Sequence, residues 1–350
     1  MKIIKKLIVF LIVFLIGLSV RCGYTALDDG SSDSKSTSSN VSSGETESQI
    51  PACEHDFEVI IIAEPLPLKD GEQKKVCKLC GETVTEPIPA TKTLKVLAVG
   101  NSFSVDGMEY LWHIATDAGC ENVILGNLYI GGCSLDMHWS NIKSDAAKYT
   151  YYKNTDGKWT ETENSPISHA VADEDWDFVT LQQVSAKSGL PQSYGNAENV
   201  ISHIASELPN AKFYWQMTWA YQHDAYTSNF NAYDRDQLKM YKAIVDTFRT
   251  KIQPNQNIDG VIPAGTAIQN LRTTHIGDTL TRDGHHLSLD FGRFTASFAW
   301  YAALTGGDVE AVDWYPEEYP KIGENLKFVQ SSVKDAIKTP FAITEQVKEK

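Results

Sequence analysis

The chain has 350 residues, of which 42% are hydrophobic, and its 31 Lys and Arg against 45 Asp and Glu give a net charge of −14. This length allows two or three domains of ordinary size, and the hydrophobic fraction is enough for a packed core. The excess of acidic over basic residues argues against a basic surface of the kind that binds nucleic acid or anionic membranes, so we expect no nucleic-acid partner.

The N-terminus has the pattern of an export signal. Three lysines in the first six residues precede an apolar run over residues 7–20, which is short for a spanning helix of about 20 residues. This pattern predicts a signal over residues 1–22. Cys22 stands where bacterial lipoproteins are lipidated, although Val20 and Arg21 replace the small residues expected there. A lipid anchor at Cys22, a cleaved signal and an uncleaved anchor stay open, and each predicts a secreted or cell-surface protein.

A spacer is predicted next. Residues 28–48 are almost entirely Ser, Asp, Gly, Thr and Glu, and such a composition cannot bury apolar area. We therefore expect a flexible linker over residues 23–50 that holds the following part away from a surface. A disordered tail without that role fits the same composition.

A small cysteine-containing module is predicted over residues 51–90. It carries two closely spaced pairs of soft metal ligands, Cys53 with His55 and Cys77 with Cys80. About 40 residues cannot fold on a hydrophobic core alone, and such pairs are typical of structural zinc. A disulfide, Cys77–Cys80 or Cys53–Cys77, is the alternative in an exported protein. The stretch resembles a zinc-ribbon-like repeat of Gram-positive cell surfaces, which implies structural Zn²⁺, contact with the cell surface or wall, and no catalytic role.

Residues 93–340 alternate predicted strands and helices and form the main domain. The predicted strands are Leu94–Val99, Asn122–Tyr129, Phe178–Leu181, Lys212–Thr218 and Gly260–Pro263. The predicted helices are Met108–Ala118, Ala197–Leu208, Gln237–Lys251 and Ser288–Leu304, the last with an aromatic stripe that we assign to the core. Short apolar strands separated by helices predict an α/β fold, with a central parallel sheet covered on both faces.

A candidate nucleophile follows the first of these strands. Ligands of open α/β sheets bind outside the carboxyl ends of the strands, and Ser102 lies there, before a helix expected to begin near Asp106. Backbone N–H groups at a helix start can stabilise an oxyanion. Taken alone, however, a serine at such a turn is more often a helix cap than a nucleophile.

A polar loop before the last helix carries the matching acid–base groups. A serine hydroxyl needs a base to take its proton, and the base needs a carboxylate to orient it. Asp283 and His286 have a spacing that lets one loop deliver both groups. His285 is a rival base, and the Asp-Gly-His-His run also fits a metal site, although no matching ligand cluster occurs elsewhere in this domain.

These two segments resemble blocks of the SGNH (GDSL-type) hydrolases. The segment Gly100-Asn101-Ser102-Phe103-Ser104 is similar to their Gly-Asp-Ser-Leu block, and Asp283-x-x-His286 to their last block. The resemblance covers about residues 94–306. It implies a flavodoxin-like three-layer sandwich, a triad of Ser102, His286 and Asp283, and hydrolysis that needs no cofactor.

The two middle blocks of that family correspond to oxyanion-hole donors. Gly131 and Gly132 follow the second predicted strand, where the family supplies a glycine N–H, and Gly132 is the closer match. The family's third block supplies an Asn, whereas this chain has Gln182 and Gln183, so the resemblance implies that one Gln amide takes that place. The chain also resembles an uncharacterised bacterial branch of the superfamily with a Leu-Gln pair at this point.

Three further residues are candidates for substrate binding. Trp219 and Tyr221 follow the fourth predicted strand and either stack on a sugar ring or pack as ordinary loop aromatics. His138 follows the glycine block and either lines the same pocket or is a hydrogen-bonded structural histidine. We therefore expect an exported serine esterase that removes acetyl or other small acyl groups, with an acylated carbohydrate or another small ester as substrate. The alternatives are a non-catalytic glycan-binding protein on a degenerate SGNH fold and a lipid ester hydrolase.

Overall fold

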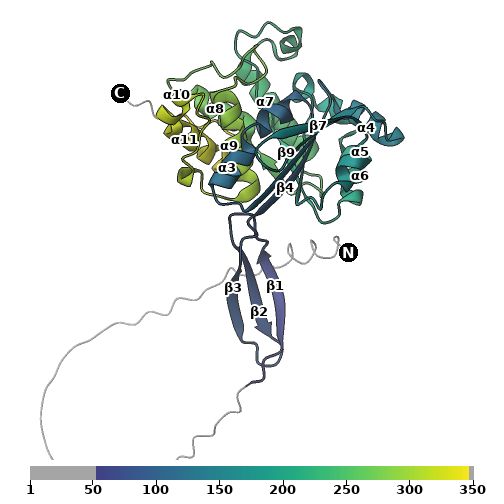
Figure 1. The fold of residues 1–350 in the computed structure, drawn as a ribbon, viewed down its shortest axis with the longest axis vertical. Helices are drawn as coiled ribbons and strands as arrows, with labels where there is room; N and C mark the ends of the chain where they lie inside the picture. The colour runs from purple at the N-terminus through teal and green to yellow at the C-terminus, as the bar shows by residue number, and fades with distance from the viewer. Residues whose placement is uncertain (1–52, 347–350) are drawn as a thin grey trace, which may run out of the picture. The chain divides into compact units, whose positions relative to one another are not determined.

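The structure, a computed structural model, describes residues 53–346 (Figure 1). The predicted signal, Cys22 and the predicted linker lie outside this range. Within it, no helix combines the length and the hydrophobicity needed to cross a membrane.

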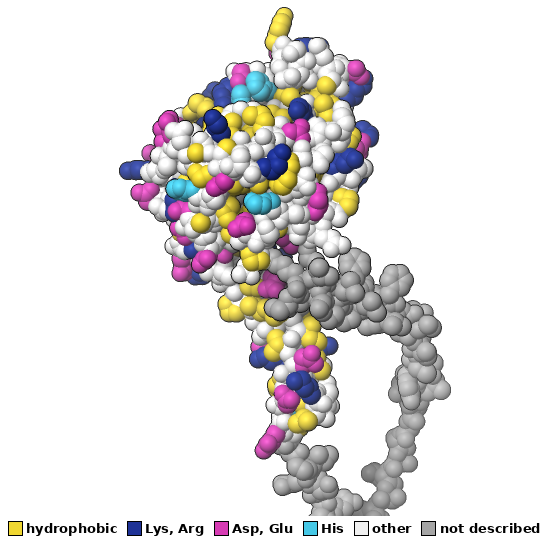
Figure 2. Space-filling view, turned by 90° about the vertical axis from the view of Figure 1, so that its right-hand side faces the viewer, with side chains coloured by type: hydrophobic (Ala, Val, Ile, Leu, Met, Phe, Trp, Pro, Cys, Tyr) yellow, Lys and Arg dark blue, Asp and Glu magenta, His cyan; other side chains and the backbone are white. Residues whose placement is uncertain are grey.

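A three-stranded antiparallel sheet forms the small N-terminal module. Its order is β1-β2-β3, with strands β1 (Phe57–Ala63), β2 (Gly71–Cys77) and β3 (Thr83–Ile88). The apolar side chains from Val59 to Ile62 are between 41% and 53% exposed, and on the face drawn in Figure 2 hydrophobic side chains of this module lie among acidic and basic ones. The sheet thus buries little apolar area, so a cross-link has to contribute to its stability.

The main domain is built on a seven-stranded sheet of order β10-β9-β8-β4-β5-β6-β7. The strands are β4 (Thr93–Gly100), β5 (Asn122–Tyr129), β6 (Tyr149–Asn154), β7 (Trp159–Ser165), β8 (Phe178–Leu181), β9 (Lys212–Gln216) and β10 (Gly260–Ile262). β4, β5, β8, β9 and β10 run parallel, whereas β6 and β7 are antiparallel. The predicted α/β fold with a central parallel sheet is therefore confirmed, with an antiparallel hairpin added at one edge.

Helices cover both faces of this sheet (Figure 1). Alternate residues of β4 point to different cores: Leu94, Val96 and Ala98 belong to one, Leu97 and Val99 to the other. The first core is covered by α2 (Ser102–Met108), α3 (Leu111–Asp117), α8 (Ala264–Arg272), α9 (Phe291–Thr305) and α11 (Leu326–Lys338). The second is covered by α4 (Leu135–Ser144), α5 (Ile167–Ala172) and α6 (Ala197–Glu207).

Two further helices, α7 (Gln237–Thr247) and α10 (Pro320–Glu324), also contribute buried residues to the first core. The others are short, namely the single turns Ser185–Lys187, Pro191–Tyr194, Ser228–Tyr233, Phe248–Ile252 and Val309–Ala311. The aromatic stripe predicted for the last long helix is core: Phe294 and Phe298 of α9 are fully buried. Because the parallel strands end at one edge, the residues after β4, β5, β8 and β9 are brought together there.

Candidate active site

Ser102 is the first residue of helix α2, directly after strand β4. Asn101 is extended (φ −143°, ψ −158°) and caps the helix, since its side-chain oxygen accepts a hydrogen bond from the Phe103 amide at 3.0 Å. A Cβ at Gly100 would lie 2.6 Å from Ser104 Oγ, so only glycine allows this turn. The helix thus begins four residues earlier than the start near Asp106 that we predicted, because Asn101, not a later residue, is the cap.

The structure brings Ser102 together with the Asp-x-x-His loop. Nε2 of His286 lies 2.9 Å from Oγ of Ser102, and Nδ1 of His286 lies 2.6 Å from Oδ2 of Asp283. The other carboxylate oxygen of Asp283 accepts the amides of His286 and His285 at 2.8 and 3.1 Å. The carboxylate therefore holds both the ring and the backbone of its own loop. This is the order of contacts in a Ser–His–Asp triad.

These hydrogen bonds set the charge state of Asp283. Burial acts to raise the pKa of its carboxyl, but donation from the His286 ring and from the His286 and His285 amides outweighs burial and lowers that pKa to about 2. The carboxylate is therefore ionised throughout the physiological pH range. An ionised acceptor favours the His286 tautomer that carries its proton on Nδ1 and leaves Nε2 free to take one from Ser102.

The loop that carries Asp283 and His286 is a narrow hairpin over residues 280–288, which we call the catalytic hairpin. The Ser288 amide donates to the Leu280 carbonyl at 2.8 Å, and the Arg282 amide to the His286 carbonyl at 2.9 Å. Gly284 at its tip has φ +89°, and a Cβ there would lie 2.9 Å from Ala225 Cβ. Both the backbone conformation and the close approach therefore require glycine.

The segment after β9 holds the tip of the catalytic hairpin. Trp219 Nε1 donates to the His285 carbonyl at 2.7 Å, and the Gln222 amide donates to the Gly284 carbonyl at 2.8 Å. The Trp219 ring stacks on Phe103, with centroids 4.1 Å apart and planes 7° apart. This ring thus connects the serine turn to the hairpin.

The three residues predicted to bind substrate are all buried. Trp219 is 0% exposed, Tyr221 1% and His138 0%. Tyr221 lies 3.0 Å from the Ser185 hydroxyl, and His138 Nδ1 lies 3.0 Å from the Tyr149 hydroxyl. Burial also lowers the pKa of His138 to about 4. A ring without exposed area cannot stack on a sugar, so burial favours the alternative of ordinary packing for Trp219 and Tyr221 and of a structural histidine for His138.

Asn101 connects three of the predicted site segments. Its Nδ2 donates to the Cys133 carbonyl at 3.0 Å, and its Oδ1 accepts from Gln182 Nε2 at 2.6 Å. The serine turn, the glycine loop after β5 and the residue after β8 are thus joined through one buried amide. Our sequence reasoning missed this role, although an Asn directly before a helix is the signal of a cap.

The predicted oxyanion donors differ in exposure and in hydrogen bonding: Gly131 and Gly132 are exposed, whereas Gln182 and Gln183 are buried. Gly132 is exposed, has φ +66°, and a Cβ there would meet nothing within 4 Å; Gly131 is exposed beside the Tyr129 hydroxyl. Gln183 Nε2 donates to the Ser193 carbonyl and hydroxyl at 2.9 and 3.2 Å. Both amide hydrogens of Gln183 are therefore in use, whereas Gln182 has one hydrogen bonded to Asn101.

His285, the rival base, lies beside His286. Its ring is 4.1 Å from that of His286, and its Nδ1 lies 3.1 Å from Asp283 Oδ1. Burial and then the neighbouring His286 lower the pKa of His285. The contact to the Ser102 hydroxyl comes from His286. Asp283, His285 and His286 also have ligand atoms within 4.8 Å of one another, so the metal alternative stays open for this loop.

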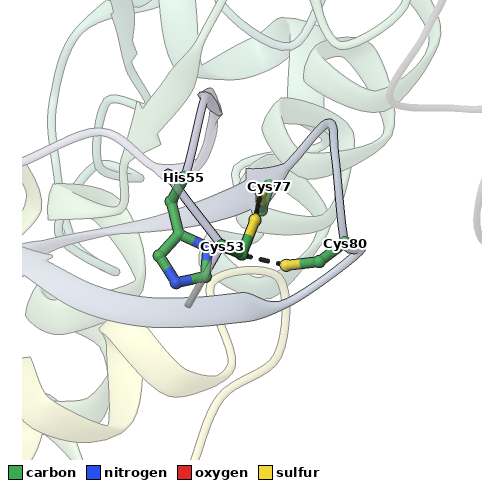
Figure 3. A group of neighbouring side chains, drawn as sticks. All are labelled: Cys53, His55, Cys77 and Cys80. Atoms are coloured by element: carbon green, nitrogen blue, oxygen red, sulfur yellow. Dashed lines mark hydrogen bonds between the residues drawn. The ribbon is translucent and has the colours of Figure 1, made fainter. Parts of the chain in front are cut away.

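The four predicted metal ligands of the small module point toward one another (Figure 3). Cys53 Sγ and Cys77 Sγ are 3.8 Å apart, and Cys80 Sγ lies 3.5 Å from His55 Nδ1. A tetrahedral zinc ion with usual bond lengths separates two thiolates by about 3.8 Å and a thiolate from an imidazole nitrogen by about 3.6 Å. The cluster therefore fits a zinc ion. The free His55 nitrogen faces Glu82 at 3.3 Å, as metal-bound histidines face carboxylates.

The cysteines of residues 53–346 are all unpaired. Cys53 and Cys77 have the sulfur spacing of two metal ligands, not of a disulfide near 2 Å. Cys120 and Cys133, in the main domain, are buried, and burial raises the pKa of each thiol to about 12. The disulfides considered from the sequence are absent from the described part of the chain.

The fold and this site define an α/β protein with a Ser–His–Asp arrangement at the carboxyl edge of a mostly parallel sheet. Residues 95–329 match the family described as a domain of unknown function (DUF4886), and the chain belongs to this family. It is similar to a DUF4886 family protein from Bacteroides uniformis, with 41% identity, a TM-score of 0.69, and coverage of 72% of this chain and 98% of that one.

Two less similar structures also align with this chain. One is a provisionally assigned SGNH hydrolase from Slackia heliotrinireducens, with 20% identity, a TM-score of 0.41, and coverage of 61% of this chain and 100% of that one. The other is a provisionally assigned GDSL-like lipase from Parabacteroides merdae, with 12% identity, a TM-score of 0.38, and coverage of 62% and 99%. No curated protein matches the sequence.

Proposed function

We propose that this protein is a serine ester hydrolase in which Ser102 is the nucleophile, His286 the general base and Asp283 the carboxylate that orients it. One observation carries the proposal: an unbroken series of contacts from Asp283 through both nitrogens of His286 to the Ser102 hydroxyl, at 2.6 and 2.9 Å. A hydroxyl nucleophile, its base and the acid that orients the base are arranged in this order.

The reaction follows from these contacts. Nε2 of His286 takes the hydroxyl proton as Oγ of Ser102 bonds to the acyl carbon of the ester. The tetrahedral intermediate collapses when the protonated His286 gives that proton to the departing alkoxide, which leaves an acylated Ser102. Water, deprotonated by His286 in turn, then releases the carboxylic acid and restores the serine.

The oxyanion donors belong to the same proposal. The Ser102 amide opens helix α2, and Gly132 is exposed in the loop that Asn101 ties to the serine turn through Cys133. We assign the third position to Gln182, because both amide hydrogens of Gln183 already bond to Ser193. Each such donor stabilises the transition state by about 3 kcal/mol.

The substrate proposed is a small acyl ester, with an acylated carbohydrate as the first candidate. The carbohydrate part rests on the N-terminal export pattern and the surface-type module, since the buried Trp219 and Tyr221 do not support it. A lipid ester is the second candidate. The same reasoning assigns the protein to the outside of the cell, in contact with the cell surface through its N-terminal region.

A structural zinc ion in the small module completes the proposal. Cys53, His55, Cys77 and Cys80 would hold it, and the ion would supply the stability that the exposed β1–β3 sheet cannot draw from a core. It takes no part in ester hydrolysis.

The proposal is tested with Ser102→Ala and, as a matched control, Ser228→Ala at an exposed serine. Ser102→Ala is expected to lose p-nitrophenyl acetate hydrolysis by at least about 1,000-fold and to lose labelling by a fluorophosphonate probe, whereas Ser228→Ala keeps both. Equal turnover by Ser102→Ala overturns the assignment. A wild-type protein that binds glycans but does not react with the probe supports the non-catalytic alternative. Acetate release from a panel of acetylated polysaccharides then identifies the substrate.

A further inference from the structure

Asp106 is a fully buried carboxylate on helix α2, four residues after Ser102. One of its oxygens accepts the Leu287 amide at 2.8 Å. The other accepts from Arg282 Nη1 at 3.0 Å and from Arg293 Nε at 2.8 Å. Burying an ionised carboxylate without such partners carries a large cost in solvation free energy. The three donors that converge on Asp106 offset this cost.

The positions of these donors relative to the catalytic hairpin are informative. Arg282 directly precedes Asp283, and Leu287 directly follows His286. Arg282 also donates to the Leu287 carbonyl, which closes the base of the hairpin between these two residues. Asp106 therefore holds both ends of the segment that carries the triad's acid and base. We call these contacts the Asp106 clamp.

The clamp joins the two halves of the triad by a second connection. Ser102 and Asp106 lie on one short helix, whereas Asp283 and His286 lie about 180 residues away on the hairpin, and the proposed catalytic groups themselves meet in the contact between Ser102 and His286. That contact has to open during each catalytic cycle, when Ser102 carries the acyl group. The groups of the clamp form no bond in the proposed reaction, so its contacts do not need to open when the serine is acylated.

We propose that Asp106 is a positioning residue that keeps the catalytic hairpin at bonding distance from Ser102. The inference rests on the proposed serine hydrolase function. A displacement of about 1 Å between reacting groups costs about 100-fold in rate, so a residue that fixes this distance acts on the chemical step without touching the substrate. Arg293, which also contacts Glu109 at 2.8 Å, anchors the clamp to helix α9.

The test uses the full chain and the substitution Asp106→Asn, which keeps the side-chain size but presents an N–H₂ group to donors. We expect kcat for p-nitrophenyl acetate and the rate of fluorophosphonate labelling to fall by about 100-fold, with KM nearly unchanged and the far-UV circular dichroism retained. The matched control is Asp173→Asn, which breaks contacts to Lys153 and the Tyr151 hydroxyl in another part of the domain. It is expected to keep the wild-type kcat.

The outcomes separate the clamp from the proposed function. A wild-type protein that neither hydrolyses the ester nor reacts with the probe disproves the hydrolase itself. An active wild type with an unchanged kcat in Asp106→Asn, or with the same loss in Asp173→Asn, overturns the clamp. If Asp106→Asn does not fold, Arg282→Gln decides: it leaves the Arg293 and Leu287 donors on Asp106, and an unchanged kcat in this variant overturns the clamp.

Discussion

Nε2 of His286 lies 2.9 Å from Oγ of Ser102, although 184 residues separate them in the sequence. The serine belongs to the β4–α2 turn and the histidine to the hairpin before α9. The two meet because α2 packs against α9 on the same face of the sheet. The site therefore depends on helix packing as much as on the residues that line it.

The two adjacent histidines are expected to differ sharply in function. His286→Ala removes the base next to Ser102 and should lower kcat for p-nitrophenyl acetate by at least about 1,000-fold. His285→Ala keeps the backbone carbonyl that accepts from Trp219 and should change kcat by less than about 10-fold. Steady-state kinetics of the two variants measure this. A larger loss of kcat in His285→Ala than in His286→Ala would show that His285 is the base.

Asp283 is expected to make the stability of the fold fall with pH in acid. Because the pKa of its carboxyl in the folded protein, about 2, is below its ordinary value of 3.8, the ionised carboxylate stabilises the fold at neutral pH. That stabilisation is lost as the pH falls from about 4 to about 2. The difference in urea midpoint between wild type and Asp283→Asn should therefore shrink over this window. A difference in urea midpoint that stays constant between about pH 4 and about pH 2 would contradict the expected contribution of Asp283 to stability.

The same Asp283→Asn substitution should also slow catalysis. The amide cannot hold His286 in the tautomer that leaves Nε2 free, and such a change lowers kcat by about 10,000-fold in a working triad. Kinetics at pH 7 measure this, with circular dichroism as the control for folding. Wild-type kcat in Asp283→Asn would exclude it from the triad.

Trp219 is expected to behave as a core residue and not as a sugar platform. Trp219→Ala removes a fully buried ring and should lower the free energy of unfolding by about 3–5 kcal/mol. Trp219→Phe keeps the stack on Phe103 but leaves the His285 carbonyl without its donor, which costs about 1–3 kcal/mol. Urea unfolding measures both. An unchanged stability with a raised KM for a glycan ester would restore the substrate-binding interpretation.

Gly284 and Gly277 form a matched pair of glycines with positive φ, +89° and +66°. An added Cβ would meet Ala225 at 2.9 Å in the first case and nothing within 4 Å in the second. Both Gly→Ala variants should lose about 1 kcal/mol of stability from backbone strain. Only Gly284→Ala should also displace the catalytic hairpin and lower kcat. Equal kcat values in the two variants would show that the hairpin tolerates that movement.

The small module is expected to bind one zinc ion per chain. Elemental analysis of Cys80→Ser should show loss of the metal, whereas Cys120→Ser, at a cysteine outside the cluster, keeps it. A chelator should remove the ion and leave ester hydrolysis unchanged, because the cluster belongs to another sheet. Hydrolysis that the chelator abolishes would instead support a metal at Asp283, His285 and His286. A metal-free wild type would contradict the zinc site.

Local pattern was sufficient for the parallel strands of the main sheet. The predicted Asn122–Tyr129 and Phe178–Leu181 coincide with β5 and β8, because buried parallel strands are short apolar runs with clear ends. The β6–β7 hairpin was missed even though Asp156-Gly157 between alternating aromatic residues is a hairpin signal. Its strands are polar on one side, as expected for an edge that only partly faces a core.

The sequence by itself determined which chemical groups are present and where along the strands they fall: the hydroxyl at 102, the carboxylate at 283, the imidazole at 286 and four soft ligands in the small module. Only the tertiary structure decided that Trp219 is buried, that Gln183 is fully hydrogen-bonded, and that Asp106 holds the catalytic hairpin. The physical reason is that periodicity and capping act over a few residues. Burial and hydrogen-bond partners depend on segments as far apart as the 181 residues between Asp106 and Leu287.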